Sequence, residues 1–328
     1  MWLMFVDRPK MTSQEDIQVT IVMATYMGAR YLREQVESIQ KQSHSNWRLV
    51  VRDDHSSDDT VGMLAEMASA DPRITMLVDD KGNLGHCQNF NELLMANAHR
   101  PYVMCCDQDD IWLEQKIETT LRKMLAAEVT FRAVPILVFT DFKVADADGS
   151  TLSNNNAVIS NIRRQAQFDL HSLLGYDYVW GCTMMLNREL LRLALPVSTQ
   201  AQNHDYWVAL VAAALGRIVF VDEPTMLYRR HALTVTGGSD VGSWKARFRR
   251  HVLAAKKHSE NVRRTEAQMV SLNEFLKSKG HHDQLLQEYV EAIEGGRLAK
   301  VRELRRLKIR RQGLGQELAY YMHVLSGR

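Results

Sequence analysis

One stretch constrains the fold more than any other. The apolar run at 103–106 ends directly in Asp107, Asp109 and Asp110, within the sequence VMCCDQDDIW. The run has the length and composition of a buried β-strand. Unpaired carboxylates are costly to bury, so acids at its end need a cation or strong hydrogen-bond donors. Carboxylate oxygens suit Mg²⁺ or Mn²⁺, so the stretch indicates a metal–diphosphate site, although a solvated loop that caps the next helix would have the same composition.

Strands and helices alternate around this stretch. Three β-branched runs predict strands and three segments with helical apolar spacing separate them: strands at 18–25, 47–52 and 74–78, helices at 31–42, 61–70 and 90–98. This alternation predicts an α/β fold with a mostly parallel, Rossmann-like sheet flanked by helices. Right-handed crossovers place the carboxyl ends of the strands at one edge. We therefore expect Thr25, Tyr26, Asp53 and Asp54 to share a crevice with the acids at 107–110.

The second half of the chain extends the sheet and then becomes helical. Further strands are predicted at 135–142, 178–186 and 218–221, with a helix at 206–215. Gly181 lies inside one of these strands, as expected where a ligand approaches closely. From Trp244 onward the pattern is helical and basic, so we predict two regions: an α/β domain at 1–240 and a helical C-terminal extension at 241–328.

Charge and cysteine usage limit the class of protein. Residues 241–328 hold 19 of the 41 Lys and Arg and 9 of the 39 Asp and Glu, which leaves 22 and 30 for the residues before them. An acidic body therefore carries a basic tail. The 4 Cys form no CxxC pair, which favours reduced thiols in a cytoplasmic protein. No apolar run in the sequence is long enough to cross a bilayer.

Asp53 and Asp54 end the second predicted strand and permit two interpretations. A carboxylate at that place can accept a hydrogen bond from a base or a ribose, or it can cap the helix that follows. We favour ligand contact for these two acids and capping for residues 58–60. The sequence has no GxGxxG after the first strand and no GxxxxGK[ST], which argues against a dinucleotide site and a P-loop.

Four later residues are also candidates for the site. Asp205 precedes a predicted helix and can be either a cap or a general base toward a hydroxyl. His231 can be a metal ligand or part of a solvated basic loop. Arg229 and Arg230, directly before it, suit a diphosphate because guanidinium groups bind phosphate oxygens in pairs.

Six segments together resemble a known family. The sequence is similar to family 2 glycosyltransferases of the GT-A fold, and within them to bacterial rhamnosyltransferases of surface polysaccharide synthesis. The matching segments follow the family's order over roughly residues 18–237: VTIVMATYMGARYLREQVESIQKQS, RLVVRDDHSSDDT, NLGHCQNF, VMCCDQDDIWLEQKI, VWGCTMMLNREL and NHDYWVALVAAALGRIVFVDEPTMLYRRH. Many relatives have Glu-Asp where this chain has His204-Asp205. The match therefore supports a role for Asp205 but implies no role for His204.

The resemblance implies a role for each matched position. The cofactor would be Mn²⁺ or Mg²⁺, and the donor a nucleotide diphosphate sugar such as a dTDP- or UDP-sugar. The positions that match the family's site are Thr25, Tyr26 and Asp54 at the base with Asp53 beside them, Asp107 and Asp109 at the ribose and metal, Asp109 and His231 as metal ligands, Asp205 as the base, and Trp180 and Gly181 on the acceptor side.

The implied reaction is an in-line displacement that inverts the anomeric carbon. Asp205 would take the proton of the attacking hydroxyl, while the cation and Arg229 or Arg230 stabilise the departing diphosphate. The acceptor would be a glycan or polyprenyl-linked glycan of a growing O-antigen, capsule or exopolysaccharide. The expected location is the cytoplasm, at the inner face of the cell membrane.

Two other classes of protein fit parts of the sequence. A nucleic-acid-binding protein would use the basic tail, but the basic core of the tail lacks interleaved aromatics and the body is acidic, so we expect no nucleic acid partner. A nucleotidyltransferase would use the same acids, but the chain lacks a Gly-rich basic loop after the first strand.

The basic tail has two interpretations of its own. Apolar residues recur every third position in 298–307, basic residues occupy much of the remainder, and LAYYMHVL follows from Leu318. Helix breaks are expected near Gly280, Gly295 and Gly313. Such a segment fits an anionic membrane surface, or it packs on the body as a helical appendage.

Overall fold

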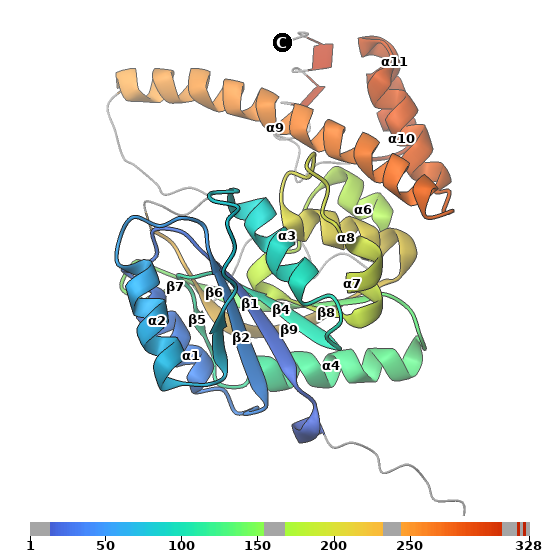
Figure 1. The fold of residues 1–328 in the computed structure, drawn as a ribbon. Helices are drawn as coiled ribbons and strands as arrows, with labels where there is room; N and C mark the ends of the chain where they lie inside the picture. The colour runs from blue at the N-terminus through green and yellow to red at the C-terminus, as the bar shows by residue number, and fades with distance from the viewer. Residues whose placement is uncertain (1–13, 154–167, 232–243, 310–319, 322–323, 326–328) are drawn as a thin grey trace, which may run out of the picture.

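The computed structural model describes residues 14–153, 168–231, 244–309, 320–321 and 324–325, with the backbone alone at 244–259. In these ranges the chain forms a nine-stranded sheet in the order β3-β2-β1-β4-β8-β6-β9-β5, with β7 paired to β6 (Figure 1). The strands are β1 (Val19–Thr25), β2 (Trp47–Asp53), β3 (Ile74–Met76), β4 (Tyr102–Cys106), β5 (Ile111–Trp112), β6 (Ile136–Ala145), β7 (Thr151–Ser153), β8 (Met184–Asn187) and β9 (Arg217–Arg229).

The first four strands of the sheet are parallel, as the sequence predicts. β1 pairs with β2 and β4, and β2 pairs with β3, all in parallel register. From β8 onward the sheet is mixed, because β8 runs antiparallel to both β4 and β6 while β9 is parallel to β6. The carboxyl ends of β1, β2 and β4 therefore meet at one edge, and Thr25, Asp53 and the acidic loop after Cys106 lie there.

Helices cover both faces of the sheet. Figure 1 shows α1, α2 and α4 on one side and α3, α7 and α8 on the other. The helices of the body are α1 (Leu32–Gln40), α2 (Thr60–Ala70), α3 (His86–Ala96), α4 (Lys116–Thr130), α6 (Leu170–Gly175), α7 (Arg188–Ala194) and α8 (His204–Leu215). Their apolar faces and the strands form one buried core, in which Ile21, Met104 and Trp207 are fully covered. Burial of this apolar area is the main force that holds the site's framework.

Several predicted boundaries differ from the structure, and three of them lie near the candidate site. α3 begins at His86 rather than at residue 90, directly after Gly85, whose φ of 76° ends the preceding loop. The expected strand at 178–186 begins only at Met184, because Gly181–Thr183 forms a short 3₁₀ turn. β9 is one long strand through Pro224, which sits where its register against β6 shifts.

The C-terminal region forms three helices: α9 (Trp244–Ser278), α10 (Gln284–Glu294) and α11 (Arg297–Arg306). Helix α9 packs against α8 of the body, α10 packs on α9, and α11 packs on α10. Gln202 donates its backbone N–H to Gln268 of α9 at 2.7 Å, and the hydroxyls of Ser198 and Ser271 lie 2.8 Å apart. The predicted breaks at Gly280 and Gly295 are confirmed. Gly313 and the predicted boundary at 240/241 lie outside the described residues.

The apolar residues of this region differ from the expected membrane face. Leu298 is 78% exposed, whereas Leu304 is buried, so α11 presents no continuous apolar stripe to solvent. Tyr320, Tyr321 and Val324 of the expected membrane-facing end are buried against protein. No helix within the described residues combines the length and the apolar character needed to span a bilayer.

Candidate active site

The turn after β1 carries the predicted base-binding residues. Thr25 donates its hydroxyl to Asp53 at 2.9 Å, and Asp53 also accepts the N–H and the hydroxyl of Ser56. The next residue, Tyr26, is 52% exposed, so its ring is available to a ligand. Thr25, Tyr26 and Asp53 thus lie together at the carboxyl edge of β1 and β2, as the sequence predicts.

Asp54 has a different environment from Asp53. Its buried carboxylate accepts from Arg52 at 3.0 Å and from the backbone N–H groups of Leu84 and Gly85, both at 2.8 Å. Arg52 also pairs with Asp79, and its hydrogen bonds lower the pKa of that carboxyl to about 2. In this structure Asp54 supports the loop before α3, so we expect it to shape the pocket rather than to contact a base.

The acidic loop between β4 and β5 gathers partners from distant parts of the chain. The carboxylate of Asp109 lies 2.7 Å from Nε2 of His231, which follows β9. Asp107 lies 3.6 Å from Nε2 of His86 at the start of α3. Asp110 accepts the backbone N–H of Arg229 at 3.1 Å. The expected pairing of Asp109 with His231 is therefore present in the geometry.

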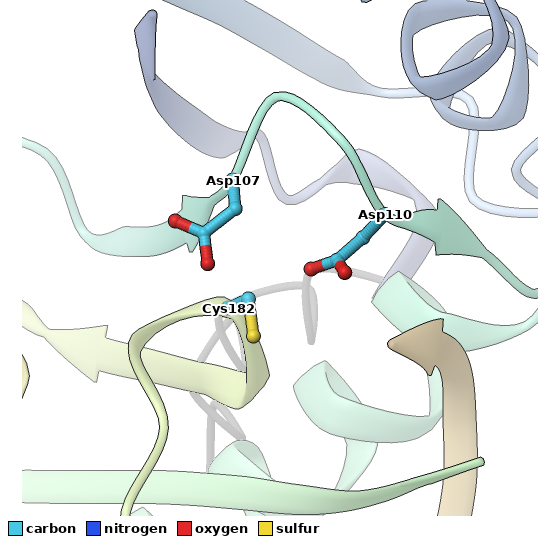
Figure 2. A group of neighbouring side chains, drawn as sticks. All are labelled: Asp107, Asp110 and Cys182. Atoms are coloured by element: carbon cyan, nitrogen blue, oxygen red, sulfur yellow. The ribbon is translucent and has the colours of Figure 1, made fainter. Parts of the chain in front are cut away.

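A thiol faces the same loop, which the sequence did not suggest. Figure 2 shows the carboxylates of Asp107 and Asp110 on the loop and Cys182 on the turn beside it. Potential ligand atoms of the three residues all lie within 4.8 Å of one another. Burial, and then the charges of Asp107 and Asp109, raise the pKa of Asp110 well above its usual value. Such crowding of carboxyl groups favours a nearby cation.

The donor set fits a divalent cation. Burial and the neighbouring Asp107 raise the pKa of Asp109, a penalty that a bound cation would relieve. Carboxylate oxygens and an imidazole nitrogen are ligands that Mn²⁺ accepts, and Mg²⁺ accepts the oxygens. Asp109 and His231 therefore match the expected ligand pair, with Asp107 next to them.

Arg229 is a correction to the sequence-based expectation. Its side chain is 2% exposed, and its guanidinium donates to the backbone oxygens of Asp109 and Ala147 at 2.8 Å and to the carboxylate of Glu34. These bonds hold the guanidinium inside the protein, which argues against a role on a diphosphate. The side chain of Arg230 is exposed and retains the predicted role as a proposal.

Asp205 lies at the start of α8 and faces the turn at Gly181. Its carboxylate accepts the N–H of Gly181 at 2.8 Å and the N–H of Tyr206 at 2.7 Å. Burial raises the pKa of Asp205, although these two hydrogen bonds partly oppose the shift. A raised pKa brings a carboxylate closer to the range in which it is an effective general base. Of the predicted acceptor-side residues, Trp180 precedes this turn and Gly181 begins it.

His204 and Phe90 complete this side of the site, and sequence reasoning missed both roles. Their rings stack with centroids 3.9 Å apart, and His86 lies 5.3 Å from His204. Burial, and then the neighbouring His86, lower the pKa of His204 well below its usual value, so the ring is neutral. A Cβ on Gly181 would lie 2.7 Å from Nε2 of His204, so only glycine fits this approach. In the sequence, the only signal of this contact between Gly181 and His204 was a glycine inside the apolar run at 178–186.

The strand order and the flanking helices define a GT-A-like α/β fold. The family described as Glycosyl transferase family 2 matches residues 20–192, which is more than half of the chain. The chain belongs to this family and is a glycosyltransferase.

Named relatives are similar over most of their own length. The dTDP-rhamnosyl transferase RfbG of Shigella flexneri is 26% identical over 72% of this chain and 80% of its own. A UDP-Glc:alpha-D-GlcNAc-diphosphoundecaprenol beta-1,3-glucosyltransferase, WfgD of Escherichia coli, is 24% identical over 60% of this chain and 71% of its own.

Solved structures support the fold. The crystal structure of S. aureus TarS residues 1–349, in complex with UDP-GlcNAc, superposes with a TM-score of 0.52 and 15% identity, covering 95% of this chain and 91% of that one. At this identity the likeness shows that the GT-A-like fold is shared.

Proposed function

We propose that this chain is an inverting, cation-dependent glycosyltransferase. It would move a sugar from a nucleotide diphosphate donor to a hydroxyl of a growing cell-surface glycan. The observation that carries the proposal is the placement of Asp205. This carboxylate with a raised pKa is held by two backbone N–H groups and faces the same region as the acids at 107–110.

In this proposal each residue has one task. Tyr26 and Asp53 would hold the nucleoside, and Asp107 the ribose. Asp109 and His231 would bind Mn²⁺ or Mg²⁺, which supplies positive charge at the departing diphosphate. Asp205 would accept the proton of the acceptor hydroxyl as that oxygen attacks the anomeric carbon. A single displacement inverts the anomeric configuration.

The donor and acceptor are proposed from the relatives. RfbG is named for dTDP-rhamnose and WfgD for UDP-Glc and a diphosphoundecaprenol-linked acceptor. We propose a dTDP- or UDP-sugar, with rhamnose as the first candidate, and a polyprenyl-linked glycan as acceptor. Such an acceptor would place the protein at the cytoplasmic membrane surface, in contact through its basic C-terminal region.

The turn after β1 argues against a nucleotidyltransferase. The backbone N–H groups of Met27, Gly28 and Ala29 donate to side chains of Ser56, Thr60 and Asp58. These groups are therefore not free to cradle a triphosphate, as the glycine-rich loops of phosphate-binding enzymes do.

A panel of nucleotide sugars tests the proposal. Purified protein with Mn²⁺ should release one nucleoside diphosphate selectively, and EDTA should stop the release. Asp109→Ala should abolish turnover without changing the melting temperature, because a partly exposed acid contributes little packing. Full activity in excess chelator would contradict the cation requirement, and pyrophosphate exchange instead of sugar transfer would contradict the reaction class.

A further inference from the structure

Gln108 joins the turn after β1 to the acidic loop. Its side-chain Oε1 accepts the backbone N–H of Tyr26 at 2.9 Å, and its Nε2 donates to the backbone carbonyl of Tyr26 at 2.9 Å. The amide therefore pairs with one residue by two hydrogen bonds, as neighbouring strands do. Asp107 and Asp109 flank Gln108, so the residues proposed for the nucleoside and for the cation are linked through one side chain.

Gly28 leaves the space that this amide occupies. A Cβ at Gly28 would lie 2.2 Å from Oε1 of Gln108 and 2.6 Å from its Cδ. The backbone of Gly28 is not in the left-handed region, so alanine is compatible with the local conformation. An alanine there would conflict with the Gln108 amide rather than with the backbone, and the flexible amide would move.

The other N–H groups of the turn have partners in residues 56–60, which lead into α2. Met27 donates to Ser56 at 2.8 Å, Gly28 to Thr60 at 2.8 Å, and Ala29 to Asp58 at 3.2 Å. The turn is thus fixed on one side by residues 56–60 and on the other by Gln108 of the acidic loop. Loss of the Gln108 contact would release the turn from the acidic loop while leaving the first set of bonds intact.

We propose that Gln108 couples nucleotide binding at the Tyr26 turn to cation binding at the acidic loop, an inference that rests on the proposed function. Whichever ligand binds first orders both loops, so the second ligand has less conformational entropy to lose. The coupling is separate from the direct contact between a cation and a diphosphate. It acts through the protein, because the Gln108 amide holds both loops. Loss of this contact should therefore weaken the binding of each ligand even when that ligand is measured alone.

Cation binding gives the first test. Free Mn²⁺ is measured by electron paramagnetic resonance, without nucleotide, for the wild type, Gly28→Ala, Gln108→Ala and the double variant. Each single substitution should weaken Mn²⁺ binding about tenfold, the range expected when two hydrogen bonds that order a loop are lost. Because both act through one amide, the double variant should bind Mn²⁺ no more weakly than Gln108→Ala.

Nucleotide binding gives the second test. Calorimetry with UDP, and in parallel dTDP, in EDTA removes any bridging cation. Gln108→Ala should weaken nucleotide binding severalfold although it lies on the acidic loop. Ser56→Ala is the matched control, because it releases Met27 on the same turn without touching Gln108. It should weaken nucleotide binding and leave Mn²⁺ binding at the wild-type value.

The outcomes separate the inference from the proposed function. A wild type that binds neither Mn²⁺ nor a nucleotide contradicts the proposed function itself. A wild type that binds both, with Mn²⁺ affinity unchanged in Gly28→Ala, contradicts the coupling. Additive losses in the double variant also contradict it, because Gly28 would then act by another route. Melting curves of all variants check that each one is folded.

Discussion

At the scale of the single residue, Asp205 is the group that we propose as the base. A second carboxyl, that of Asp177, is partly buried, and this burial, followed by the charge of Asp205, raises its pKa well above the usual range. Two carboxyls in one low-dielectric region resist joint ionisation, which favours a protonatable base at the acceptor side. The hydrogen bonds of the two carboxylates differ. Asp205 accepts the backbone N–H groups of Gly181 and Tyr206, whereas Asp177 accepts the backbone N–H of Val179.

Replacement of Asp205 tests its role as the base. Asp205→Asn preserves shape but removes the proton acceptor, so turnover should fall by roughly 100-fold or more. Asp177→Asn is the control, since it removes a neighbouring, partly buried carboxyl that we assign no proton transfer. Steady-state rates with saturating donor compare the two variants. Equal losses in both would show that the region's charge, rather than Asp205 itself, matters.

The raised pKa of Asp205 also predicts two pH effects. The base must be ionised, so kcat should fall as the pH drops through its folded-state pKa, above the value of about 4 for an ordinary Asp. The surrounding charges are His86, which lowers this pKa, and Asp107, which raises it. Because the folded pKa is raised, ionised Asp205 costs stability above the unfolded pKa. Asp205→Asn should therefore melt no lower than the wild type at pH 7, and a clear drop would favour a capping role.

At the scale of the element, the end of β9 depends on one buried arginine. Arg229 donates to Asp109 and Ala147 backbone oxygens, its own N–H donates to Asp110, and its guanidinium lies 4.9 Å from the ring of Tyr31. His231, two residues later, packs on the same ring at 4.6 Å. Arg229 therefore holds the strand end that places His231 opposite Asp109.

Two neighbouring arginines, Arg229 at the end of β9 and Arg230 directly after it, provide a matched pair of variants. Arg229→Met leaves buried acceptors without donors and should cost about 2–3 kcal/mol of unfolding free energy. Arg230→Met should leave stability unchanged, because its side chain is exposed, and raise the KM for the donor about tenfold through loss of a charge near the diphosphate. Urea unfolding measures the effect on stability, and initial rates at varied donor concentration measure the KM. A loss of stability in Arg230→Met together with a raised KM in Arg229→Met would show that the two roles are the other way round.

At the scale of the whole molecule, the C-terminal helices belong to the folded body. Lys300 pairs with Glu266 of α9, and Arg306 with Glu288 of α10 at 2.6 Å. The hydroxyl of Tyr320 donates to Glu266 at 3.2 Å. Within the described residues, two basic side chains of the expected membrane face therefore pair with acidic residues of α9 and α10. This pairing favours the interpretation of the tail as a helical appendage packed on the protein. The partly exposed pair of Arg306 with Glu288 contributes little, so apolar burial is the main force that holds the helices.

Flotation with liposomes distinguishes the two interpretations of the tail. If the basic residues contact a membrane, the full chain should float with anionic vesicles, the bound fraction should fall with salt, and a truncation before Trp244 should not bind. If the tail is only an appendage, both proteins should remain unbound and the truncation should lower the melting temperature, because it uncovers Met269, Leu272 and their partners on the body. Binding that survives the truncation would place the contact elsewhere.

The sequence by itself determined the parallel first half of the sheet and the edge at which the site lies. Apolar periodicity located β1, β2 and β4, and three acids after β4 could not be buried without partners. The order of the family's segments then predicts that Asp205 and His231 belong to the site, and the structure places His231 against Asp109.

Only the tertiary structure decided which polar groups meet. Arg229 was expected at a diphosphate and is buried on Glu34, 195 positions away, while Cys182, Gln108 and His204 had no expected role. Periodicity reports which face of an element is apolar, but it carries no information on partners that lie far apart along the chain. Those partners are fixed by how the strand ends and loops pack together, which is a property of the folded chain as a whole.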